Sequence, residues 1–271
     1  MSRSAGPVNT IVKVLLTLMY GLPLLWILLT SFKSSADVFA TDSTFVFRPV
    51  VTAYVEALDG ALLDALQQSV IIAVGTTALT LAIAIPAGYG LARTRGWAVS
   101  VGLGLLIVLQ MLPQTANVIP LFQIFGDWGL LDSTLGVVIA DSALLVPFAV
   151  ILMRPFFRAV PPQLEEAAAI DGASVLRSFL SVVLPVARNG VATTGTLVFL
   201  LAWGEFLYAV NFFLSPGTYP LSALLAQQVS AFGINWPGLM ALAVLSSVPV
   251  LIVYSLTYRL LRDGLTVGAV K

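Results

Sequence analysis

Long apolar runs separated by short polar segments dominate this chain. A helix needs about 20 apolar residues to cross the hydrocarbon core of a bilayer. Six stretches predict membrane spans: residues 11–32, 69–92, 97–122, 135–157, 191–214 and 239–261. The segments between them hold nearly all of the charged residues. The pattern therefore predicts an all-α integral membrane protein, with six transmembrane helices in a single domain over residues 1–271.

The composition supports membrane insertion. The chain is 59% hydrophobic and 10% charged, with a mean hydropathy of +0.99, whereas soluble domains are about 25% charged. The first span could instead be a cleaved signal, because Arg3 and Lys13 precede it and Ser34-Ser35-Ala36 resembles a cleavage site. Its apolar run exceeds the roughly 7–15 residues of a signal core, which favours a retained helix.

The basic residues predict the orientation. With both termini in the cytoplasm, eleven of the 13 lysines and arginines lie inside, and Lys33 and Arg48 lie outside. Cytoplasmic loops carry an excess of Lys and Arg, so we predict an N-in, C-in topology. Five of the six predicted spans contain a proline, which removes a backbone donor and kinks the helix. Such kinks fit best where helices pack on each other or line a cavity. The prolines are Pro23, Pro86, Pro113, Pro147 and Pro249.

Several kinds of chemistry are excluded because the chain has no cysteine and no histidine. It cannot form disulfides, thiol nucleophiles or imidazole acid–base pairs, and no metal or cofactor site is expected. Without a Gly-x-Ser-x-Gly elbow, an intramembrane hydrolase is disfavoured. No Gly-x-x-x-x-Gly-Lys-Ser/Thr loop is present for ATP. The balance of 13 basic and 13 acidic residues gives no indication of a nucleic-acid partner.

A polar segment between the fourth and fifth predicted spans, residues 158–188, carries its own helix start and stop. Pro161-Pro162 suits a first helical turn, because proline there loses only a donor that had no partner. Glu165 and Glu166 fall in that turn, where the helix dipole favours negative charge. Gly172 predicts the stop, as the residue just past the helix end. One narrow face of the helix carries Leu164, Ala167, Ala168 and Asp171.

This helix is expected to serve a partner protein. Ser174 is placed to cap a second short helix. A helix with a narrow alanine face and two carboxylates can dock into a groove on another protein. The alternative is a loop lying along the lipid head groups, which two adjacent glutamates oppose because the cytoplasmic leaflet is negatively charged.

The same segment resembles a known family. Glu166-Ala167-Ala168, then Gly172, then Val182-Val183-Leu184-Pro185 resembles the EAA loop of ATP-binding-cassette (ABC) importer permeases, with Val182 where the family has isoleucine. Other segments resemble, in order along nearly the whole chain, the carbohydrate-uptake permeases of the maltose-transporter type. They are Leu24-Leu25-Trp26, Thr30-Ser31-Phe32-Lys33, Gly129-Leu130-Leu131-Asp132, Leu145-Val146-Pro147-Phe148, Trp203-Gly204-Glu205-Phe206-Leu207 and residues 264–271.

The resemblance implies a permease subunit, not an enzyme, in the inner membrane of a prokaryote. Its implied partners are a second permease (giving a heterodimer), an ATPase dimer that holds ATP and Mg²⁺, an external solute-binding protein and membrane lipid. Residues 262–271 are expected near the ATPase, and residues 215–237 near the solute-binding protein. The coupling residues it implies are Glu165, Glu166, Ala167, Ala168, Asp171, Gly172, Leu184 and Pro185, with Glu166 pairing with a basic residue of the ATPase.

Polar residues within the predicted spans mark an expected substrate path or gate. They are Trp203, Glu205, Tyr208, Asn211, Asp141 and Gln110. A carboxylate at the position of Glu205 costs at least about 2–4 kcal/mol, so it should face a cavity or a partner. Related permeases commonly have asparagine where this chain has Gly204, which weakens direct sugar binding there. Structural, gating and substrate-contact roles for Glu205 stay open.

An ion-coupled secondary transporter is the competing interpretation. Glu205 and Asp141 would then be proton sites. That hypothesis explains the carboxylates but gives no role to the capped polar helix. The solute stays open among sugars, polyols and glycerol phosphates.

Overall fold

The computed structural model describes residues 7–40, 45–215, 217, 219–231 and 233–267. The chain divides into two compact units. Unit 1 comprises residues 1–63 and 224–248, and unit 2 comprises residues 64–223 and 249–271. The last four residues of the predicted C-terminal tail, 268–271, lie outside the described residues.

Unit 1 holds the first long helix and a small hairpin. Its elements are α1 (Pro7–Ser31), α2 (Ser35–Phe39), α3 (Thr52–Asp59), β1 (Val229–Ser230), β2 (Gly233–Ile234) and the first part of α14 (Trp236–Val267). The two strands pair antiparallel, with Val229 opposite Ile234 and Ser230 opposite Gly233. Ser34 caps α2, because its hydroxyl accepts the backbone N–H of Asp37.

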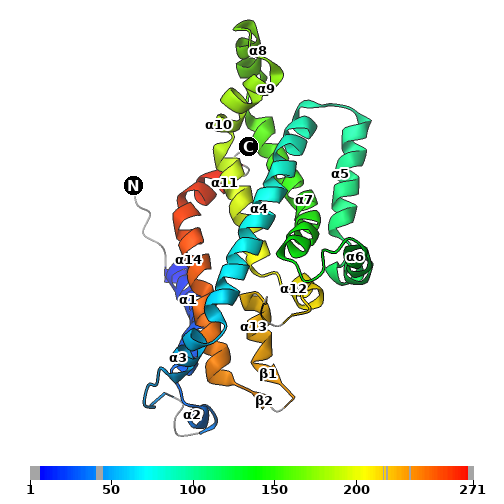
Figure 1. The fold of residues 1–271 in the computed structure, drawn as a ribbon. Coiled ribbons are helices and arrows are strands. Elements are labelled where there is room, and N and C mark those ends of the chain that lie inside the picture. The colour runs from blue at the N-terminus through cyan, green and yellow to red at the C-terminus, as the bar shows by residue number, and fades with distance from the viewer. Residues whose placement is uncertain (1–6, 41–44, 216, 218, 232, 268–271) are drawn as a thin grey trace. The chain divides into compact units, whose positions relative to one another are not determined.

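Unit 2 is a helical bundle that holds most of the remaining elements (Figure 1). They are α4 (Leu62–Arg93), α5 (Trp97–Gln110), α6 (Gln114–Asp127), α7 (Thr134–Ala159), α8 (Pro162–Ile170), α9 (Val175–Ser178), η2 (Phe179–Val183), α10 (Leu184–Val186), α11 (Arg188–Trp203), α12 (Leu207–Phe212) and α13 (Leu221–Gln227). The start of α4 and the end of α13 belong to unit 1.

Helix α7 is central to unit 2. Of its most apolar stretch, 56% is buried, against 28% for α4. Small residues let the other helices approach it closely. A Cβ added at Gly88 of α4 would lie 3.0 Å from the Met153 side chain, and one at Gly190 of α11 would lie 2.3 Å from the Phe156 ring. The bundle is therefore assembled around α7 by contacts that leave no room for larger residues.

Four of the predicted spans match single long helices: α1, α4, α7 and α14. Each is long and apolar enough to cross a membrane. Among the described residues, these four are the helices that are long and apolar enough as single helices. Two bent helix pairs also qualify if each pair is counted as one span, which gives up to six spans.

The other two predicted spans are not single straight helices. Residues 97–122 form α5 and α6, which meet at a bend of 90°. Pro113 lies at that break in an extended conformation (φ −66°, ψ 133°), because it lacks the N–H that would continue the helix. The predicted span 191–214 divides into α11 and α12, separated by Gly204–Phe206. Helix α11 is also bent by 76° from the helical segment Val175–Val186.

Candidate functional site

Helix α8 begins and ends where the sequence predicts. Pro162 opens it after extended Pro161, and Gly172 follows its end with φ +80°. The N–H of Gly172 donates to the carbonyl of Ala169 (3.0 Å), and that of Ala173 donates to Ala168 (2.9 Å). This pair of bonds is the Schellman motif, which requires the left-handed conformation that glycine adopts freely. Ser174 then caps α9 by accepting the N–H of Arg177.

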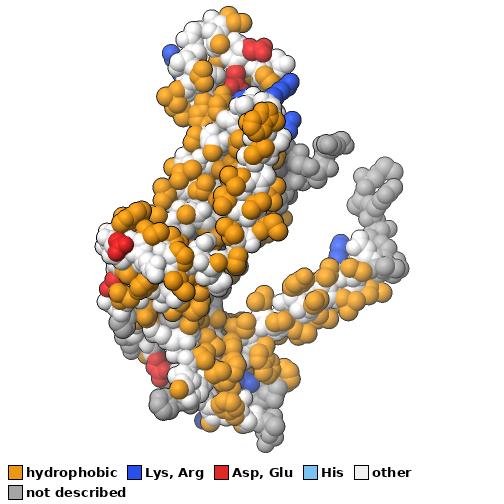
Figure 2. Space-filling model, turned by 90° about the vertical axis from the view of Figure 1, so that its right-hand side faces the viewer, with side chains coloured by type: hydrophobic (Ala, Val, Ile, Leu, Met, Phe, Trp, Pro, Cys, Tyr) orange, Lys and Arg blue, Asp and Glu red, His pale blue; other side chains and the backbone are white. Residues whose placement is uncertain are grey.

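The region around α8 exposes apolar side chains next to its carboxylates. Helices α8 and α9 lie at the top of Figure 1. At the same end in Figure 2, acidic and basic side chains lie among hydrophobic ones. Glu166 and Ala167 are exposed on α8 itself. We call the neighbouring exposed apolar set the loop surface: Ile170, Val175, Leu176 and Leu180, of which Ile170 is 87% exposed. Exposed apolar side chains beside charged ones are typical of interaction surfaces.

Glu165 is turned inward, unlike Glu166. Its Oε1 accepts the Nε–H of Arg93 at 2.6 Å, with Nη2 of the same guanidinium at 2.5 Å. Its Oε2 accepts the hydroxyl of Tyr89 at 2.5 Å. Charge-assisted contacts of this kind are about twice as strong as neutral hydrogen bonds. Glu165 thus fastens α8 to the end of α4.

The same guanidinium also closes the end of α7. Arg93 donates to the backbone carbonyls of Phe157 (2.9 Å) and Val160 (3.1 Å). Those carbonyls lie at the helix C-terminus, where a cation is favourable. The ring of Tyr89 packs on Phe179 of η2, with ring centres 4.6 Å apart. Four elements, α4, α7, α8 and η2, are therefore tied at one point.

The sequence did not reveal Arg93 and Tyr89 as part of this site. Arg93 entered the sequence analysis as one of many basic residues that set orientation. Of the other predicted coupling residues, Leu184 packs against the buried cluster formed by Met153, Phe157, Val160, Phe179, Val183 and Ala187, and Pro185 is exposed.

Glu205 occupies a buried polar junction. It is 7% exposed, and its Oε1 accepts the backbone N–H groups of Ala209 (3.2 Å) and, in a shorter contact, Tyr208. Its Oε2 accepts Nε2 of Gln114 at 3.0 Å, and its backbone carbonyl accepts the hydroxyl of Ser222. The carboxylate therefore caps the first turn of α12 and joins it to α6. The hydropathy pattern did not reveal the break before either helix: α6 begins after Pro113, and α12 begins after Gly204–Phe206.

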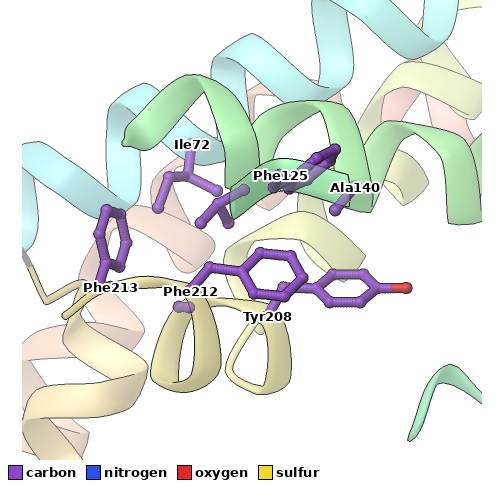
Figure 3. Close-up of a cluster of buried hydrophobic side chains, with 8 residues drawn as sticks. Ile72, Phe125, Ala140, Tyr208, Phe212 and Phe213 are labelled. Atoms are coloured by element: carbon purple, nitrogen blue, oxygen red, sulfur yellow. The ribbon is translucent and has the colours of Figure 1, made fainter. Parts of the chain in front are cut away.

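Tyr208 connects this junction to a cavity. Its ring is stacked on Phe212 within a buried apolar cluster, with ring centres 5.3 Å apart. Figure 3 shows its hydroxyl pointing away from that cluster. A cavity of about 240 Å³ is lined by Tyr208, Asn117 and mainly apolar residues of α5, α6 and α7. Gln114 and Asn117, both on α6, were not predicted as site residues.

The remaining predicted path residues are Gln110, Asn211, Trp203 and Asp141. Gln110 donates to the carbonyl of Leu144 (2.9 Å), and exposed Asn211 donates to that of Leu207 (2.7 Å) within its own helix. Trp203 stacks on Phe199 at 5.8 Å. Asp141 is buried on α7 at 3% exposure. The structure therefore brings Tyr208 and Asp141 within electrostatic range of Glu205, whereas Gln110 and Asn211 donate to carbonyls elsewhere.

Comparison with known proteins identifies the class of protein to which this helical bundle belongs. A profile of the family "Binding-protein-dependent transport system inner membrane component" matches residues 84–267. The chain belongs to this family. It is a multi-pass inner-membrane component, a permease rather than an enzyme.

Curated relatives extend over most of the chain. An ABC transporter permease protein of Streptomyces antibioticus is 36% identical over 210 residues, covering 78% of this chain and 92% of that protein. The sulfoquinovosyl glycerol transport system permease SmoH of Agrobacterium fabrum is 32% identical over 270 residues, covering 99% and 95%. The diacetylchitobiose uptake system permease DasC of Streptomyces coelicolor is 32% identical over 263 residues, covering 92% and 91%.

The fold is shared with a solved structure. A crystal structure of a bacterial ABC transporter involved in the import of the acidic polysaccharide alginate contains a similar chain, with a TM-score of 0.80 and 24% identity. The match covers 96% of this chain and 98% of that one. It shows that the two chains share a fold.

Proposed function

We propose that this permease moves a sugar or sugar-like solute into the cytoplasm, driven by an ATPase chain that docks on α8 and the loop surface. The printed substrates of two relatives, sulfoquinovosyl glycerol and diacetylchitobiose, support a carbohydrate-like solute. ATP and Mg²⁺ bind to the partner ATPase and not to this chain. An ion-coupled carrier is not favoured, because the family transports together with a separate binding protein.

The observation that carries the docking proposal is the chemistry around α8. Exposed Glu166 can pair with a basic residue of the ATPase, while exposed Ala167 and small Ala168 permit close approach. The loop surface would supply the apolar area of that interface. Glu165 has a different role in this proposal, since it already holds Arg93 and transmits force to α4 and α7.

The complete transporter would contain this chain, a second permease, two ATPase copies and an external solute-binding protein. With the predicted N-in, C-in orientation, α8 and the predicted C-terminal tail would be on the ATPase side. The hairpin β1–β2, within residues 215–237, then faces the solute-binding protein. In this arrangement Glu205 and Tyr208 lie at the gate, with Asp141, Gln110, Trp203 and Asn211 along the path.

A matched pair of exposed valines tests the docking surface. Val175→Asp places a charge in the loop surface, and Val229→Asp makes the same change on the hairpin, where the valine is 53% exposed. Val175→Asp should greatly reduce recovery of the ATPase when the transporter is purified through this chain, and Val229→Asp should leave recovery unchanged. Equal recovery of the ATPase with both variants would exclude the loop surface as its docking site.

A further inference from the structure

A cavity rich in arginine lies in unit 2, where the end of α4, the start of α5, the end of α7 and the start of α8 meet. Its volume is about 460 Å³. We call it the arginine pocket. Its polar lining consists of Arg93, Arg95, Arg154, Arg158, Thr94 and Ser100. Among the described residues that line it, none is acidic.

The positive charge of this pocket is largely uncompensated. Arg93 has Glu165 as its ion-pair partner, and Nε of Arg154 donates to the carbonyl of Leu91 at 3.1 Å. In the described part of the chain, no carboxylate lies within ion-pair distance of Arg95, Arg154 or Arg158. Several guanidinium groups around one cavity repel one another unless an anion lies between them. Their planar forks match the oxygens of a phosphate group.

The pocket lies at the depth of lipid head groups. Arg93 is the last residue of α4 and Arg158 is in the last turn of α7, and both helices are long and apolar enough to span the membrane. Trp97, at the start of α5, is 79% exposed. Tryptophan gathers where a bilayer meets water, and basic pockets between the ends of membrane helices bind anionic head groups.

The neighbouring surface can accept acyl chains. On α5, the face that lines the pocket through Val99 and Ser100 continues along the helix to Leu103 and Ile107, and Ile107 is 53% exposed. A soluble phosphate ion has no apolar part that could contact this surface. The acyl chains of a phospholipid would cover it while the lipid phosphate binds in the pocket. The charge accounts for a phosphate in the pocket, and the apolar surface favours a lipid over a free anion.

We infer that the arginine pocket binds the phosphodiester head group of an anionic phospholipid. The lipid would hold the turn between α4 and α5 against the end of α7, directly beside the start of α8. This inference depends on the membrane location of the chain and not on the proposed coupling role of α8. The proposed orientation would set the leaflet, which is then the cytoplasmic one.

Lipid retention by the assembled transporter tests the inference. Complexes are purified from nanodiscs of phosphatidylglycerol and phosphatidylcholine, and bound phosphatidylglycerol is measured by native mass spectrometry. Arg95→Gln with Arg158→Gln removes two exposed charges of the pocket. At about fivefold per charge near a membrane surface, retention should fall by roughly 30-fold.

The control pair removes the same charge elsewhere. Lys13→Gln with Arg48→Gln changes two exposed residues of unit 1, outside the arginine pocket. This pair should retain phosphatidylglycerol as the parent chain does. Equal retention by the pocket pair and the control pair would overturn the inference.

Two further measurements separate other occupants. Displacement of the retained lipid by millimolar glycerol phosphate would show that the pocket takes a soluble phosphate, against the inference. The chain has no cysteine, so Thr94→Cys gives this chain a single label at the pocket. Phosphatidylglycerol should protect it from a thiol reagent. Protection by the ATPase chain in pure phosphatidylcholine would instead identify a protein interface and overturn the lipid assignment.

Discussion

Arg93 and Glu165, 72 residues apart in the sequence, are joined by contacts of 2.5 and 2.6 Å between one guanidinium and one carboxylate oxygen. Both side chains are about four-fifths buried. Because Arg93 also donates to the carbonyls of Phe157 and Val160, movement of α8 acts on α4 and α7 together. The relationship gives the proposed docking helix a direct mechanical connection to the bundle.

Removing this connection should uncouple ATP hydrolysis from transport. Arg93→Gln is expected to lower the stability of the complex by about 1.5–3 kcal/mol, as for a lost hydrogen bond to a charged group. Glu165→Gln should be milder, because Arg93 keeps its two carbonyl partners. The measurements are the thermal unfolding midpoint and the solute imported per ATP hydrolysed.

The charge swap Arg93→Glu with Glu165→Arg distinguishes coupling from general damage. It restores the ion pair but not the bonds to the carbonyls of α7, so part of the lost coupling ratio should return. A swapped chain that behaves no better than Arg93→Glu alone would contradict a coupling role for the pair.

Tyr89→Phe keeps the ring contacts and loses one hydrogen bond, so it should change stability by about 0.5–1.5 kcal/mol.

Gly172 offers a test of the helix stop. It has φ +80°, and no described atom lies within 4 Å of a Cβ built there. Gly172→Val should therefore destabilise the end of α8 through backbone strain alone, by about 1–2 kcal/mol or more. Gly172→Asn should be tolerated better, since asparagine visits this conformation. Binding of the ATPase by the purified permease is the measurement.

Gly90 is the control for that substitution. It lies in α4 with equally open surroundings and without a positive φ. Gly90→Val should leave ATPase binding unchanged. If the two valine variants bound the ATPase equally well, the helix stop would not matter for docking.

The close approach at Gly190 predicts a packing defect. A Cβ there would lie 2.3 Å from the ring of Phe156. Gly190→Ala should cost about 1–3 kcal/mol through overpacking, which the unfolding midpoint of the purified permease would report. Gly102→Ala, where a Cβ meets no described atom within 4 Å, should cost nothing measurable. Partial recovery on adding Phe156→Leu would attribute the defect to this contact, and no recovery would contradict that attribution.

Local and uniform signals made part of this structure predictable. The helices α1, α4, α7 and α14 follow from long apolar runs, which need no knowledge of their neighbours. The end of α8 followed from Gly172 and its neighbours alone, because a helix stop is a local event.

The bends between helices and the side-chain contacts between distant helices could not be predicted from such local signals. Apolar residues continue past Pro113 into α6, so the hydropathy pattern could not show the 90° bend between α5 and α6. The inward turn of Glu165 depends on Arg93, which the fold brings from a distant helix. Two adjacent glutamates therefore looked equivalent in the sequence, although one is an internal tie and the other is exposed.

Substitutions at Glu205 distinguish a structural role for its carboxylate from a role in carrying protons. Its oxygens accept two backbone N–H groups of α12 and the amide of Gln114. Glu205→Gln keeps one carbonyl acceptor for the backbone donors, and Gln114 can turn its amide to present oxygen to the new NH₂ group. ATP-driven uptake in reconstituted vesicles should therefore persist in this variant, with an unchanged dependence on pH.

Glu205→Ala, by contrast, leaves buried donors unpaired and should destabilise the complex by about 1–3 kcal/mol, with reduced uptake. Gln114→Leu should have a smaller effect, because the cap on α12 is kept. Assembled, ATP-hydrolysing complexes of the Glu205→Gln variant that no longer transport would show that the charge itself is needed. That result would favour the proton-coupled interpretation over a neutral structural gate.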